Sequence, residues 1–257
     1  MNKSKYFSPH WTIYILDLNN TTVMYYLKTF ETTEEYNKSS LICPNVSLTK
    51  DDNLLHFKMF NYADLGLTSG TLWMKCNIGA TSETDYGLYF QWGDTVGYTD
   101  TSHSTWSTCP GNGGNSSYNS TSITVWDKEH LTNGVLKTDV DAAYVHTNGK
   151  AKMPTVVQCQ ELLNETDHTW VEDFNGSGIN GMKFVNKKDS SKYIFIPASG
   201  NAWGGSFNGV GNFGLLWSSS VDTSLAQFAG YLDFGSDYYG VYDISRRYGH
   251  CVRGVVK

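Results

Sequence analysis

The chain has 257 residues, of which 40% are hydrophobic and only 17% charged, with 25 Gly, 17 Tyr and 8 Trp. This length allows one or two domains with a sizeable core, and the excess of Gly and aromatic residues over charged ones favours short strands and turns over a helical bundle. A net charge of −6 without a long basic run argues against nucleic-acid binding, and the lack of a run of 18 apolar residues argues against membrane insertion.

Residues 1–61 predict a small module. β-branched and aromatic residues predict strands over 11–16 and 22–26, and Thr32 with Glu35 forms a capping-box pattern for a helix ending near Leu41. Two apolar runs, 45–48 and 54–57, flank a charged turn and predict a hairpin. Because about sixty residues rarely fold stably alone, we expect this module to depend on a partner, on other copies of itself or on the rest of the chain.

Residues 62–257 predict short strands separated by Gly, Ser and Asn, among them 71–74, 88–92 and 193–196. The stretch 97–124 is poor in apolar residues and predicts a long surface excursion. Two helices are expected, one over 139–146 and one after Pro154, where Thr155 is the N-cap and Gln158 completes a capping box. Many short strands with two helices predict an α+β fold.

Metal and catalytic patterns are absent from the sequence. The five cysteines are widely spaced and predict reduced structural thiols, and the seven histidines form no pair at metal-binding spacing. Asp139 and Asp141 lie two apart on a predicted helix, where side chains do not face each other, so they are a poor acid and base pair. We expect no cofactor and no metal.

A series of short segments, in order, resembles a known family. The segments are Asp64–Trp73, Cys76–Ala80, Tyr86–Thr95, Asp141–Ala143, Met153–Thr155, Glu161–Leu163, Phe195–Gly200, Leu216–Ser220 and Gly249–Val255. Together they resemble the Fibrobacter succinogenes major paralogous domain, which is common in Bacteroidetes and their phages. The resemblance covers residues 63–257, and this chain departs from it with Ala151-Lys152 in place of Trp-Arg and with Gly254 in place of Pro.

The resemblance implies a C-type-lectin-like domain over 62–257, with the fold shared by formylglycine-generating enzymes and by the receptor-binding proteins that diversity-generating retroelements vary. The calcium motifs Glu-Pro-Asn and Trp-Asn-Asp do not occur, so calcium-dependent sugar binding is not expected. The close cysteine pair of the enzymes is also absent, so we expect no enzymatic activity.

The segment 30–48 is similar to leader segments of structural proteins from gut Bacteroidetes phages. This similarity implies that residues 1–61 attach the chain to other virion proteins and form a homotrimer. The N-terminus lacks the apolar core of a signal peptide, so the expected protein is made in the host cytoplasm and carried on a virion as a head or tail fibre or decoration subunit. The alternatives are a bacterial surface adhesin and an inert capsid decoration protein.

Residues 217–249 contain five Tyr, six Ser and four Asp, and no Lys or Glu occurs over 193–256. Tyr offers a large contact area at low entropic cost, so this composition is typical of a recognition surface, and it also fits adenine mutagenesis by a retroelement. With Trp203, which Gly and Ser neighbours place in an exposed loop, the candidate contacts to a host-surface glycan or protein are Trp203, Asp222, Thr223, Ser224, Tyr231, Asp233, Ser236, Asp237, Tyr238, Tyr239, Tyr242, Asp243, Ser245, Arg247 and Tyr248.

The alternative for these residues is the solvated face of ordinary antiparallel strands, with Leu232 and Phe234 inward. The predicted core comprises Trp73, Trp92, Trp170, Trp217, Phe228, Leu232, Phe234, Val252 and Val255.

Overall fold

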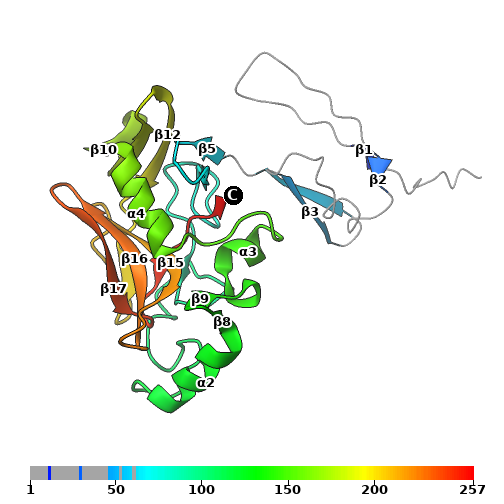
Figure 1. Cartoon of the computed structure of the whole chain (residues 1–257), viewed down its shortest axis with the longest axis vertical. Helices are drawn as coiled ribbons and strands as arrows, with labels where there is room; N and C mark the ends of the chain where they lie inside the picture. The colour runs from blue at the N-terminus through cyan, green and yellow to red at the C-terminus, as the bar shows by residue number, and fades with distance from the viewer. Residues whose placement is uncertain (1–10, 13–28, 31–45, 52–53, 60–61) are drawn as a thin grey trace, which may run out of the picture. The chain divides into compact units, whose positions relative to one another are not determined.

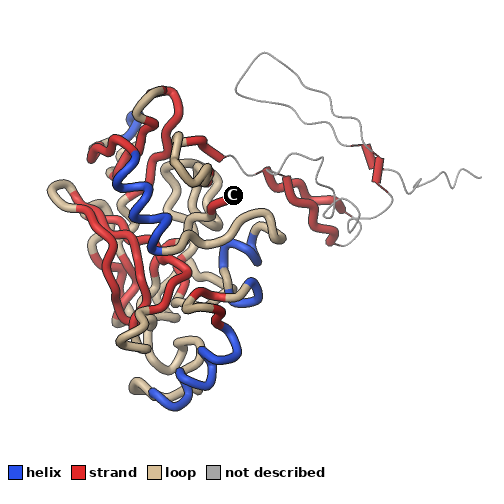
Figure 2. Tube along the Cα trace, viewed as in Figure 1, coloured by secondary structure: helices blue, strands red, loops and turns tan. Residues whose placement is uncertain are grey.

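The computed structural model describes residues 11–12, 29–30, 46–51, 54–59 and 62–257. The chain divides into two compact units, Met1–Phe60 and Asn61–Lys257. Figure 1 colours the elements along the chain, and Figure 2 shows that strands outnumber helices in the larger unit. The α+β class is confirmed.

Two strand pairs make up the described part of the first unit. β1 (Trp11–Thr12) pairs antiparallel with β2 (Thr29–Phe30), and β3 (Val46–Asp51) forms a hairpin with β4 (Leu54–Met59). The predicted hairpin is therefore confirmed. The predicted strand over 22–26 and the predicted helix over 32–41 lie outside the described residues.

Two three-stranded sheets flank the centre of the second unit. β5 (Tyr62–Asp64), β6 (Leu72–Met74) and β19 (Val255–Val256) join the first and last strands of the unit in the order β19-β6-β5. β10 (Thr166–Val171), β11 (Gly181–Asn186) and β12 (Asp189–Pro197) form an antiparallel meander.

The largest sheet carries the Tyr-rich segment. It runs β17 (Tyr239–Ser245), β16 (Phe228–Gly235), β15 (Phe213–Val221), β18 (His250–Cys251) and β7 (Tyr89–Phe90), with β9 (Val135–Leu136) beside β15 and β8 (Leu131–Thr132) beside β9. All pairs are antiparallel except β15 with β18. β17 is an edge strand, so it pairs with a neighbour on one side only.

Within residues 62–257, three α-helices accompany the sheets: α2 (Ser120–His130), α3 (Ala142–His146) and α4 (Val156–Glu165), with single 3-10 turns over Thr138–Val140 and Phe174–Gly176. The capping box of Thr155 and Gln158 begins α4 as predicted. The predicted helix over 139–146 is shorter, because Asp141 caps α3 instead of continuing a helix. α2 was not predicted, and it occupies the end of the expected surface excursion.

The core lies between the largest sheet, α4 and the β10–β12 meander. α4 packs against β15, β16 and β17 on one side and β10 on the other (Figure 1). Its buried Cys159 and Leu162 contact the cluster that includes Leu232 and Phe234. Seven of the nine predicted core residues are buried, whereas Trp170 and Phe228 are only half-buried because they lie at the rims of their sheets.

Candidate binding face

Strand register sorts the Tyr-rich side chains onto two sides of the sheet. Side chains directly opposite each other on antiparallel strands point to the same side. Leu232 pairs with Val241, and both contact the core. Tyr231 pairs with Tyr242, and each is the neighbour in sequence of one of those two core residues. Because successive side chains alternate, the two tyrosine rings lie on the outer side.

Some predicted contacts lie on the core side instead. Tyr239 pairs with Phe234, and its ring meets the edge of the His168 ring on β10, with 4.2 Å between centroids. Asp243 and Ser245 share that side by alternation, and Ser245 is buried. The fifteen predicted residues are therefore not one surface, which corrects the expectation of a single contact face.

The loop residues of the prediction fall into two places. Asp222 accepts hydrogen bonds from the backbone amides of Ser224 and Leu225, so its carboxylate shapes the β15–β16 loop. Asp222 and Thr223 line a groove beside α4 together with Asp243. Ser236 and Asp237 are exposed in the β16–β17 turn.

A continuous row of rings crosses the outer side of the sheet. Centroids are 5.7 Å apart between Trp203 and Tyr248, 6.4 Å between Tyr248 and His250, 5.3 Å between His250 and Tyr231, and 6.3 Å between Tyr231 and Tyr242. We name as the aromatic face the following residues: Trp203, Tyr231, Asp233, Tyr238, Tyr242, Arg247 and Tyr248.

Trp203 reaches this face from a short hairpin. β13 (Asn201–Trp203) and β14 (Ser206–Asn208) are joined by Gly204 and Gly205, which have positive φ values of 60° and 80° that glycine adopts without strain. The expected loop is thus a two-residue hairpin turn. The expected exposure is confirmed, since 46% of Trp203 is accessible.

Buried rings support the row from below. His250 is fully buried, and its ring stacks on Trp217 with 4.1 Å between centroids. Neither ring nitrogen has a hydrogen-bond partner among the described residues. Burial lowers the pKa of His250 to about 3, so the ring is neutral at physiological pH. Nothing in the spacing of the histidines along the chain predicted this role.

The basic end of the aromatic face is Arg247. Its guanidinium lies 5.3 Å from the Tyr248 ring centroid and 5.9 Å from that of Trp106. The neighbouring Arg246 is structural, because it is fully buried and forms two hydrogen bonds with Asp127 on α2, at 2.6 and 2.9 Å. Of this pair, only Arg247 contributes to the surface.

The acidic end is Asp233. The Tyr231 hydroxyl donates to its Oδ2 over 3.4 Å, and Tyr231 itself is largely buried. Burial is the main reason that the pKa of Asp233 rises to about 6, and the hydrogen bond from Tyr231 opposes that rise. The aromatic face therefore runs from an anion to a cation along a row of rings, some of them exposed and some buried.

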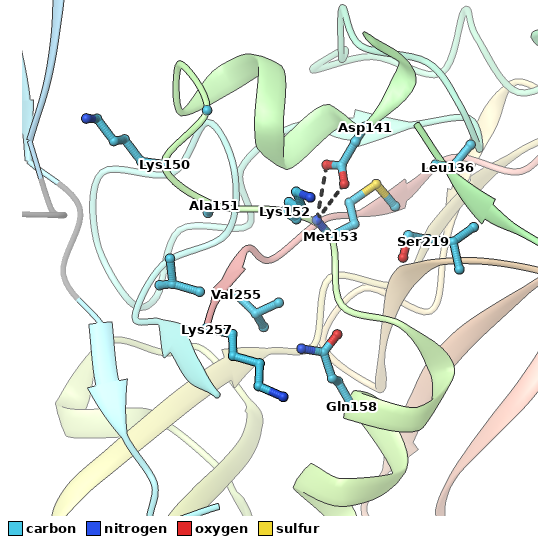
Figure 3. A pocket seen from close by; sticks show the side chains of 13 residues that line it. Leu136, Asp141, Lys150, Ala151, Lys152, Met153, Gln158, Ser219, Val255 and Lys257 are labelled. Atoms are coloured by element: carbon cyan, nitrogen blue, oxygen red, sulfur yellow. Dashed lines mark hydrogen bonds between the residues drawn. The ribbon is translucent and has the colours of Figure 1, made fainter. Parts of the chain in front are cut away.

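A separate pocket of about 360 Å³ lies beside α3 (Figure 3). Asp141 lies in its wall, where its carboxylate accepts hydrogen bonds from the backbone amides of Tyr144, at 2.9 Å, and of Met153, at 3.0 Å. Burial raises the pKa of Asp141 to about 6. These backbone bonds give Asp141 a structural role. Asp139 instead lies 3.1 Å from His130, so the two carboxylates are not paired.

Within the described part of the chain, no group of three or more His, Cys, Asp or Glu side chains is placed to hold a metal ion. Cys76, Cys109, Cys159 and Cys251 carry free thiols, and burial raises the pKa of the Cys159 thiol to about 12. None of the described helices is long and apolar enough to span a membrane. No family model, curated protein or solved structure matches the chain.

Proposed function

We propose that the second unit is a non-enzymatic binding head of a phage virion protein, and that its aromatic face binds a glycan or protein on the host surface. One observation carries this proposal: a row of rings on the outer side of the largest sheet connects an anionic end to a cationic end, with Trp203, Tyr238 and Tyr242 exposed on it. Tyr and Trp rings stack on sugar rings or fill a protein interface. The charged ends would orient the ligand by hydrogen bonds.

The finer fold belongs to the same proposal. We take the unit to be C-type-lectin-like and related to the Fibrobacter succinogenes major paralogous domain. The resembling segments supply fully buried side chains, among them Trp73, Trp217 and Arg253. Arg253 donates to Asn77 Oδ1 at 2.9 Å and to the Phe195 carbonyl at 2.8 Å, so it joins three of those segments. The resemblance therefore rests on residues that hold the fold together, not on the aromatic face.

The first unit would attach the head to other virion proteins and assemble it as a homotrimer. A single aromatic face offers a modest contact area. Several copies on one particle raise the effective concentration after the first contact, which converts a weak affinity into firm attachment.

The test is binding of the full chain to a panel of Bacteroidetes strains, measured by flow cytometry. The proposal predicts saturable binding to some strains and none to others. Equal binding to all strains would contradict the proposal. Binding to none would also contradict it and would favour an inert decoration protein.

A further inference from the structure

The acidic end of the aromatic face holds a carboxylate whose hydrogen bonding is incomplete. Asp233 Oδ1 is shielded from water and has no hydrogen-bond partner among the described residues. Asp233 Oδ2 accepts a long hydrogen bond from the Tyr231 hydroxyl at 3.4 Å, and the Phe234 backbone amide and the Tyr238 hydroxyl also interact with the carboxylate and lower its pKa. Burial outweighs these interactions, so the carboxylate is only partly compensated for its lost hydration.

Two tyrosines interact with this carboxylate, and a third, Tyr242, lies over Gly240, the residue opposite Asp233 on the neighbouring strand. The ring of Tyr231 lies 6.3 Å from that of Tyr242 across the strand pair. Tyr238, in the turn that joins the two strands, is close enough to Asp233 to hydrogen-bond with it and also faces Tyr242. The outer two rings are accessible, with 41% of Tyr238 and 49% of Tyr242 exposed. The partly buried carboxylate thus lies among accessible ring faces.

The protein supplies no cation there. Asp233 forms no ion pair within the part of the chain that the structure describes, and residues 193–245 contain neither Lys nor Arg. Arg247 lies beyond the far end of the strand pair, past the Phe228 and Ser245 positions. Burial raises the pKa of Asp233 to about 6, which leaves an incompletely solvated anion at neutral pH.

We propose that this acidic end binds an alkylammonium group of the ligand. Asp233 is the counter-ion, and the rings of Tyr238 and Tyr242 face the charged methyl or methylene groups through cation–π contacts. Tyr231 forms the floor and orients the carboxylate. A neutral sugar hydroxyl satisfies one lone pair but leaves the charge uncompensated, whereas any alkylammonium compensates the charge and one with an N–H also donates a hydrogen bond. The inference rests on the proposed function, since the ammonium would belong to the host-surface ligand.

Three small probes separate charge from shape in titrations of the full chain followed by NMR. Choline carries a quaternary ammonium, butylammonium a primary one, and 3,3-dimethylbutan-1-ol has the shape of choline without its charge. We expect choline or butylammonium to bind at least about tenfold more tightly than the alcohol, a difference typical of one desolvated cation–π contact with a counter-ion. Equal affinity for all three probes, or binding of none, would overturn the inference.

Two matched variants locate the site. Asp233→Asn removes the charge from the aromatic face, and Asp243→Asn removes the same charge from the opposite side of the neighbouring strand. Ammonium affinity should fall about tenfold in the first variant and stay unchanged in the second. An equal effect of both variants would mean that the negative charge acts only through its long-range field, which would contradict the assigned site.

The inference and the proposed function fail in different ways. Strain-selective cell binding that persists in Asp233→Asn and is not inhibited by choline would keep the proposed function and remove the ammonium site. Choline binding without any cell binding would keep the site and remove the proposed role in host attachment.

Discussion

At the scale of single residues, burial changes the protonation of groups beneath and beside the aromatic face. His250 is held neutral between Trp217 and Tyr231, with two ring nitrogens that lack partners among the described residues. Asp233 lies two residues along β16 from Tyr231, where burial favours its protonated form. The two groups therefore affect stability in opposite directions as the pH falls.

We predict that His250→Phe raises stability more at pH 5 than at pH 7.5. With a folded-state pKa of about 3, His250 takes up a proton in the unfolded state first, so wild-type stability falls as the pH drops below about 6.5. At pH 5 this loss is about 2 kcal/mol. Phenylalanine keeps the stacked ring and removes the loss. Urea unfolding at the two pH values measures it, and an advantage that is the same at both would show that His250 is not the acid-sensitive group.

For Asp233→Asn we predict the opposite trend. The folded-state pKa of about 6 exceeds the ordinary value, so the wild-type protein gains stability as the pH falls through 6 and its carboxylate protonates. The groups that face Asp233 are the hydroxyls of Tyr231 and Tyr238 and the backbone amide of Phe234, with Asp237 and Tyr242 beyond Tyr238. The variant should be more stable at pH 7.5, because it removes a charge that burial disfavours. The gain should be only about 1 kcal/mol, because solvent partly screens this group.

This advantage should disappear by about pH 4, where the wild-type carboxyl is also neutral in the folded protein. Thermal unfolding of both proteins across this range provides the measurement. A variant that is less stable than wild type at pH 7.5 would mean that the ionised Asp233 is well compensated, against the account of the acidic end.

At the scale of elements, the sequence predicted those helices and strands whose ends or faces are set by residues close together in the chain. The capping box at Thr155 predicted the start of α4, and alternation predicted that Leu232 and Phe234 face inward. α2 was missed because its Ser and Thr residues are weak helix formers and only Ile123 is buried. A contact far along the chain holds this helix, between Asp127 and the buried Arg246.

The candidate site was predictable in composition but not in geometry. Tyr239 and Tyr242 look alike in the sequence, yet pairing with Phe234 turns the first toward the core side and pairing with Tyr231 turns the second outward. Register is a tertiary property, and a shift of one residue exchanges the two sides. His250 was missed for the same reason, because its partner Trp217 lies on another strand.

The anchor of α2 gives a prediction for an element. Asp127→Ala leaves the fully buried Arg246 guanidinium without its carboxylate, which costs about 3 kcal/mol of unfolding free energy. Glu129→Ala, on an exposed position of the same helix, is the matched control and should cost under about 0.5 kcal/mol. Chemical denaturation compares the two, and equal costs would mean that the ion pair does not hold α2.

At the scale of the whole molecule, the chain separates into a small first unit and a larger second unit with its own core. If the first unit is the assembly module, the full chain should be a trimer by size-exclusion chromatography with light scattering. Deletion of residues 1–60 should give a folded monomer, since the core cluster lies within residues 63–255. A monomeric full chain would contradict the proposed assembly role.

The central claim is that the outer side of the β16–β17 pair binds the host, and a comparison of two tyrosines on β17 tests it most directly. Tyr242 and Tyr239 have similar exposed fractions, 49% and 52%, but lie on opposite sides of the sheet. We would measure binding of Tyr242→Ala and Tyr239→Ala to a strain that binds the wild-type chain. The account predicts at least about tenfold weaker binding for Tyr242→Ala, as expected of an aromatic contact at the centre of an interface, and near wild-type binding for Tyr239→Ala. Loss of binding in Tyr239→Ala alone would contradict it.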